Sequence, residues 1–268
     1  MIIGIRSDFI LVMVAFFLYG IYTLLCGLYV YLQIHQQGQR RYYQLSLLLL
    51  YLLATLVIII LTTQFIMLLQ LEVLEFGDDF NVDIFEHLTV ASRSVYVAAN
   101  FVADALLLYR CYIVWGSRRY IIASLVIISL SMLGEEIFSP AALVVSESIL
   151  YFGFISVNLF TNLMLTGLVA GRIWWLNRAT QRSLGISKSN RKSINGIAAT
   201  VLESGLLYPI AIIIDIVVVL QAQVDMQPVL TLVVGIAPTL IMVRNQLRIS
   251  VEIDSEQTAT RSDPEATT

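Results

Sequence analysis

The polar side chains best placed to do chemistry lie inside long apolar stretches of this sequence. Asn100 and Asp104 are four residues apart in one stretch, and Asn158 and Asn162 repeat that spacing in another. Residues four apart occupy one face of a helix, so each pair is expected to face a neighbouring helix. Amide and carboxylate groups on facing helices can form a hydrogen-bonded cluster, a ligand site or a path for protons.

Two ion pairs are also expected between apolar stretches. A helical rise of about 1.5 Å per residue places Arg110 and Glu203 about 8 and 9 Å from the same predicted interface, so they are expected to pair or to share one polar cluster. Arg93 and Asp215 fall within about one helix turn of each other in the opposite half, where they form a second predicted pair. An unpaired charge in the hydrocarbon region costs at least about 2.5–3.5 kcal/mol.

These polar residues allow three interpretations. They can hold helices together, because amide and hydroxyl side chains hydrogen-bond across helix interfaces. They can form a ligand site or a conformational switch, or they can carry protons or ions. The first two interpretations are favoured over transport. Pro209 and Pro238 are expected to kink their helices, as hinges or as static bends.

Catalytic and metal chemistry lack a suitable set of residues. His35 and His87 are isolated in predicted loops, and the sequence contains no nucleophile motif. Asp104 and Glu203 differ by about 7 Å in predicted depth, which disfavours a proton shared between them. We therefore expect no enzymatic activity, no catalytic residue, no metal and no cofactor.

The elements that carry these residues are expected to be membrane-spanning helices. Hydrophobic residues form 58% of the 268 residues, charged residues form 13%, and the mean hydropathy is +0.83. Soluble domains carry about 45–50% apolar and about 25% charged residues. A soluble fold of this size could not bury so much apolar surface in one core. The expected partner is therefore the lipid bilayer, and no nucleic acid is expected to bind.

Seven stretches have about the length that a spanning helix needs. They cover residues 9–33, 45–70, 88–115, 120–138, 149–176, 197–222 and 229–247. The predicted fold class is an all-α integral membrane protein, a seven-transmembrane helix bundle within residues 1–249. Lys and Arg occur in the first, third and fifth connections and are absent from the other three. This asymmetry places the N-terminus outside and the C-terminus in the cytosol.

Two polar segments complete the predicted cytosolic side. The connection 177–195 is basic and serine-rich, and is expected to contact lipid headgroups or a cytosolic signalling protein. Residues 250–268 are polar and acidic, and are expected to form a disordered tail. The plasma membrane is the favoured location, with an internal membrane as the alternative. No oligomeric state is predicted.

Several segments taken together resemble a known family. They are ADALLLYRCYIVW (103–115), TN (161–162), TGL (166–168), RIW (172–174), ESGLLY (203–208) and GIAPTLI (235–241). The combination is similar to a large family of seven-helix membrane proteins from mushroom-forming fungi, the basidiomycetes. It covers the region from the third to the seventh predicted helix. The resemblance implies the seven-helix topology and no particular activity.

The helix number and orientation are also similar to G-protein-coupled receptors, by analogy of fold alone. Arg110 resembles the receptor switch arginine in position, and Glu203 would be its partner on the sixth helix. The sequence departs from receptors because Tyr109, not an acid, precedes Arg110. Microbial rhodopsins are excluded because both lysines, Lys188 and Lys192, lie in the fifth connection, so no last-helix lysine can bind retinal.

The leading hypothesis is a receptor-like protein that senses a small or lipophilic ligand and signals through its cytosolic loops. A membrane transporter or channel is one alternative, although the polar residues form separated levels and the sequence shows no internal repeat. A non-catalytic membrane scaffold is the other, in which polar contacts only pack helices.

Overall fold

The computed structural model describes residues 2–35, 41–73, 82–114, 147–184, 203, 205–222 and 226–261. These residues form helices, apart from a turn at Leu206 and the non-helical Met226, and contain no strand. The helices are α1 (Ile2–His35), α2 (Arg41–Val73), α3 (Val82–Val114), α5 (Glu147–Leu184), α7 (Leu207–Ala222) and α8 (Gln227–Arg261). The predicted all-helical class is confirmed for this part of the chain.

Four of these helices are long and apolar enough to cross a membrane. Their candidate spans are Asp8–Ile34, Gln44–Gln70, Asp83–Tyr109 and Gln227–Arg244, and α7 adds a shorter apolar segment, Leu207–Gln221. α1 leaves large hydrophobic side chains uncovered, including Phe17 at 69% and Leu24 at 76% exposure. A helix that is apolar all round and still exposed requires lipid rather than water as its surroundings.

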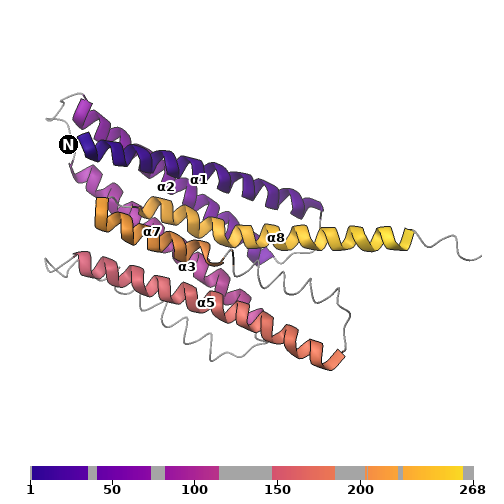
Figure 1. The fold of residues 1–268 in the computed structure, drawn as a ribbon. Helices are drawn as coiled ribbons and strands as arrows, with labels where there is room; N and C mark the ends of the chain where they lie inside the picture. Colours follow the sequence, from indigo (N-terminus) through magenta and orange to yellow (C-terminus); the bar gives the residue numbers. More distant parts are fainter. Residues whose placement is uncertain are drawn as a thin grey trace, which may run out of the picture.

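α8 is the central helix of the bundle. It packs against α1, α2, α3 and α7. In the most apolar part of its span, 83% of the residues are buried, whereas the corresponding share in α1 is only 17%. Figure 1 shows α8 between α1 and α7, with its C-terminal part continuing past the ends of both. α3 connects the other elements, because it packs against α2, α5 and α8.

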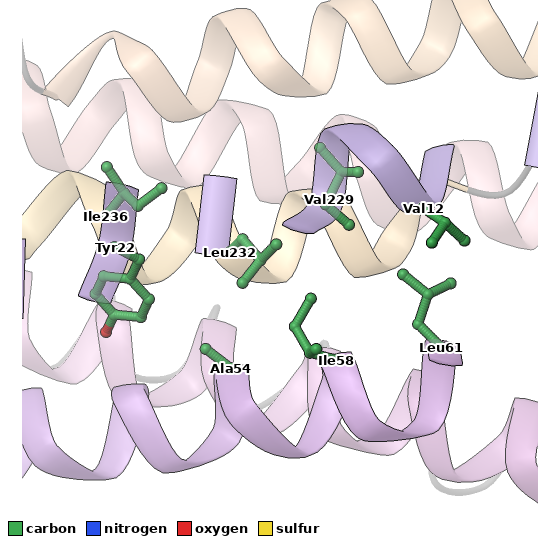
Figure 2. Close-up of a cluster of buried hydrophobic side chains, with 9 residues drawn as sticks. Val12, Tyr22, Ala54, Ile58, Leu61, Val229, Leu232 and Ile236 are labelled. Carbon is green, nitrogen blue, oxygen red and sulfur yellow. The ribbon is translucent and has the colours of Figure 1, made fainter. Parts of the chain in front are cut away.

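Apolar side chains from α1, α2 and α8 form one part of the core (Figure 2). The cluster consists of Val12, Ala15, Tyr22, Ala54, Ile58, Leu61, Val229, Leu232 and Ile236. Tyr22 is fully buried there. A Cβ atom on Gly235 would lie 2.8 Å from both Cζ and the hydroxyl oxygen of Tyr22. Glycine at this position therefore lets the tyrosine ring lie directly on the backbone of α8.

The described helices extend beyond the predicted spans. Predicted spans 9–33, 45–70 and 149–176 lie within α1, α2 and α5, and α3 begins six residues before the predicted residue 88. The predicted disordered tail is wrong in its first part, because α8 is helical through Arg261. A helix already nucleated within the membrane extends at little cost, even through polar residues.

Several predictions fall outside the described residues. These are the fourth predicted helix at 120–138, the part of the basic connection from 185 to 195, and the beginning of the sixth predicted helix at 197–202. The seven-helix count and the sidedness of the termini therefore stay predictions. What the structure establishes is a helical bundle with four candidate membrane spans among the described residues.

Candidate functional site

Three helices contribute polar side chains to the interior of the bundle. Tyr96 and Asn100 come from α3, Asn158 and Asn162 come from α5, and Tyr208 comes from α7; we refer to these five residues as the buried polar network. The four-residue spacing within α3 and within α5 keeps each pair on one helix face. Every member of the network is at most 7% exposed, so its polar atoms depend on one another for hydrogen bonds.

Asn158 is the central donor of the network. Its Nδ2 donates to the Tyr208 hydroxyl at 2.7 Å, to Asn100 Oδ1 at 3.3 Å and to the Tyr96 hydroxyl at 3.4 Å. Asn162 Nδ2 in turn donates to Asn158 Oδ1 at 3.2 Å. One amide on α5 thus contacts residues of both α3 and α7.

The two tyrosines close the network between α3 and α7. The Tyr208 hydroxyl donates to Asn100 Oδ1, and the Tyr96 and Tyr208 hydroxyl oxygens are 3.3 Å apart. Asn100 Nδ2 donates back to the Tyr96 carbonyl within α3 at 3.0 Å. Apolar side chains surround these groups, among them Leu50, Ile155, Ile212, Leu230 and Val234. The low-polarity surroundings strengthen each hydrogen bond and make an unpaired group costly.

A small cavity of about 20 Å³ adjoins the network. Asp104, Thr166 and Pro238 help to line it, together with Asn100, Asn162 and Tyr208 from the network. Gly205, just before α7, lies so close to the Thr166 side chain that a Cβ atom there would collide with it. The structure therefore brings the predicted residues Asn100, Asp104, Asn158 and Asn162 into one region.

Glu203 does not lie in this region. Its Oε2 accepts a hydrogen bond from Arg244 Nη1 of α8 at 2.7 Å, and the two side chains are 70% and 40% exposed. The side chain of Arg110 lies outside the described part of the chain, so the predicted pairing of Arg110 with Glu203 stays a prediction. In this structure the acid instead links the segment preceding α7 to α8.

The structure places Arg93 and Asp215 in different surroundings, because the Arg93 side chain is exposed and Asp215 is completely buried. Their predicted pairing stays a prediction. The buried face of α3 includes Ser92, Tyr96 and Asn100. Arg93 follows Ser92 and is rotated by about 100° from it, away from this face. Similar depth along two helices therefore does not by itself bring two side chains together, because rotation about each helix axis also matters.

The two prolines occupy different positions. Pro209 is the third residue of α7, and α7 begins directly after the turn at Leu206. A first-turn proline breaks no helical hydrogen bond, and its ring is incompatible with a regular helix through the preceding turn. Pro238 lies inside α8, which is helical on both sides of it. The interruption before Pro209 thus divides the sixth predicted span, and a bend at Pro238 stays a prediction.

The site residues predicted from the sequence do not include Tyr96, Tyr208 or Arg244. Spacing places Tyr96 on the same inward-facing stripe as Asn100 and Tyr208 on a similar stripe with Asp215, so the pattern contains the signal for both tyrosines. No pattern pairs Arg244 with Glu203, because they come from different helices. Comparison with known proteins finds no match to a family model, to a curated protein or to a solved structure. The resemblance to fungal seven-helix proteins therefore stays a prediction from the sequence.

Proposed function

We propose that this chain is a receptor-like, seven-helix membrane protein with its N-terminus outside and its C-terminus in the cytosol. In this proposal it senses a small or lipophilic ligand and signals through its cytosolic loops. The observation that carries the proposal is the buried polar network, in which the Asn158 amide contacts α3 and α7 at once. A change in the position of one helix must break or re-form these bonds, which makes the network a candidate switch.

The ion pair between Glu203 and Arg244 adds support. It joins the segment before α7 to the last residue of the α8 span Gln227–Arg244, on the side that the distribution of basic residues assigns to the cytosol. An exposed ion pair contributes about 0–1 kcal/mol, so it can open without unfolding the bundle. A contact that is easily broken at a cytosolic surface is suited to a conformational signal.

Guanine-nucleotide exchange on fungal Gα subunits tests the proposal, with the purified full chain in lipid nanodiscs. We expect wild type to raise exchange above the protein-free rate. Glu203→Arg should change that rate, and adding Arg244→Glu should restore it, because the reversed pair can re-form. Arg110→Ala should abolish exchange if this arginine contacts the Gα subunit. Glu86→Gln, on an exposed acid at the predicted outer end of α3, is the control and should behave as wild type.

A scaffold is the second candidate, since the same hydrogen bonds also hold α3, α5 and α7 together. It predicts no exchange from any variant across several Gα subunits, together with loss of stability when the network is disrupted. That combination of results would overturn signalling through Gα and leave the network as a packing device.

A further inference from the structure

The small cavity beside the buried polar network is lined by an uneven set of polar atoms. It lies between α3, α5, the start of α7 and α8, and holds about 20 Å³. This is room for one water molecule or one ion of similar size. Its polar lining comes from Asn100, Asp104, Asn162, Thr166 and Tyr208. Most of the atoms they offer are oxygens, and one of these residues carries a carboxylate.

The lining groups differ in whether their oxygens already accept hydrogen bonds. Asn100 Oδ1 does, because it accepts from Tyr208 and Asn158. Asn162 uses its Nδ2 as a donor to Asn158, which leaves its own Oδ1 as an acceptor. Among the described residues, no hydrogen bond or ion pair engages Asn162 Oδ1, the Thr166 hydroxyl or the Asp104 carboxylate. Three oxygen-bearing side chains therefore border the same water-sized space, and no residue in the described part of the chain donates to these oxygens.

The chemistry of this set points to a small monovalent cation. Carboxylate, amide and hydroxyl oxygens are ligands for hard cations, whereas transition metals favour His and Cys. One carboxylate balances one positive charge, so a divalent ion would leave an uncompensated charge in a low-polarity interior. The small volume favours Na⁺ over the larger K⁺. We propose that this cavity binds Na⁺ through the Asp104 carboxylate, Asn162 Oδ1 and the Thr166 hydroxyl oxygen.

The proposed site lies between two helices, so a bound ion would affect the stability of the bundle. Asp104 and Asn162 come from different helices, α3 and α5, and the cavity is also bordered by Pro238 of α8. An ion held by both α3 and α5 stabilises their packing by an amount set by its concentration and affinity. This inference does not depend on signalling, because binding and exchange on Gα are measured separately.

The test is the heat stability of the purified full chain in detergent, measured as the fraction that stays monodisperse after heating. NaCl is titrated against choline chloride at constant ionic strength, with KCl as a parallel series. We expect a saturable rise of the melting temperature with Na⁺ and a weaker rise with K⁺. Asp104→Asn should abolish the Na⁺-dependent rise. Thr166→Val should weaken the apparent Na⁺ affinity about tenfold, because it removes one oxygen ligand while keeping the shape.

Glu86→Gln is the matched control, because it removes an exposed acid of the same helix, and it should keep the full response to Na⁺. The proposal is overturned if wild type melts at the same temperature in Na⁺ and choline. It is equally overturned if Asp104→Asn retains the Na⁺-dependent rise. A variant that is less stable overall does not confuse the result, because each variant is compared with itself in the two salts.

Discussion

Asn158 supplies a nitrogen donor where three different side chains offer oxygens, and this makes it the residue on which the network most depends. Replacing it by leucine keeps the branched shape and the number of side-chain heavy atoms, and leaves Tyr208, Asn100 and Tyr96 without their shared donor. Buried groups that lose their partner cost about 1–3 kcal/mol. We therefore expect Asn158→Leu to lower the midpoint of heat-induced aggregation in detergent by several degrees.

Ser94→Ala is the control for this prediction. The Ser94 hydroxyl is exposed and donates only to the Val90 carbonyl of its own helix at 2.9 Å, so its removal should have little effect. The double variant Asn158→Leu with Asn100→Leu should lose less stability than the sum of the single variants, because the two residues share a bond. Additive losses would contradict the network as one unit.

At the scale of residues, helix-face spacing indicated which polar side chains come together. Asn100, Asp104, Asn158 and Asn162 share a region of the bundle, as their spacing indicated. Individual partners of the charged residues could not be derived, because depth along a helix says nothing about rotation around it. Arg93 illustrates this, since its predicted depth lies within about one helix turn of that of Asp215 while its side chain is exposed.

At the scale of elements, the contact between α1 and α8 depends on a missing side chain. Gly235→Ala would place a Cβ atom 2.8–2.9 Å from three atoms of the buried Tyr22 side chain. Contacts this short force the ring or the backbone of α8 to shift within a packed core, so we expect a loss of about 1–3 kcal/mol. The measurement is again heat stability, and the expected result is a clear decrease.

Gly27→Ala in α1 is the matched control, since a Cβ atom there meets nothing within 4 Å. Alanine has a higher helix propensity than glycine, so this variant should equal or slightly exceed wild type. Combining Gly235→Ala with Tyr22→Leu should recover part of the loss of Gly235→Ala, because the smaller side chain leaves room. A Gly235→Ala protein as stable as wild type would contradict the close packing of α1 on α8.

A second prediction at the scale of elements concerns the part of α8 that continues as a helix beyond its membrane span. Hydrogen exchange should find the amides of residues 250–257 protected, since α8 is helical through Arg261. Asp254→Pro should abolish this protection locally, because proline removes a helical donor and costs about 3 kcal/mol in a helix interior. Heat stability should be unchanged, since the substitution lies beyond the span Gln227–Arg244. Fast exchange of these amides in wild type would restore the predicted disordered tail.

At the scale of the whole molecule, the separation of basic and acidic connections predicts that the two termini lie on opposite sides of the membrane. In intact cells an epitope tag at the N-terminus should be cleaved by external protease, and one at the C-terminus should be protected. A tag within the acidic connection 74–81 is the control for an outside segment. Protection of both terminal tags would mean an even number of spans and would remove the cytosolic placement of the Glu203–Arg244 pair.

Composition and the lengths of the apolar stretches were enough to predict a helical membrane protein. Charged residues form only 13% of the chain, and the apolar stretches are long enough to cross a membrane. Composition and length could not predict that α8 is central and α1 peripheral. Among the four candidate spans, that of α1 is one of the two most apolar and nevertheless the least buried, since lipid accepts apolar side chains as readily as a protein core does. The hydropathy of a span therefore does not predict whether its helix is central or peripheral in the bundle.

The central position of α8 also has a consequence for biosynthesis. α8 is translated after α1, α2, α3 and α7, all of which it contacts. Until it enters the bilayer, Tyr22 on α1 and Tyr208 on α7 lack the α8 side chains that pack against them. The earlier helices must therefore wait in the membrane as a loose, protease-sensitive assembly that quality-control factors can recognise. Premature termination before α8 should accordingly lead to degradation of the product rather than to a shorter stable protein.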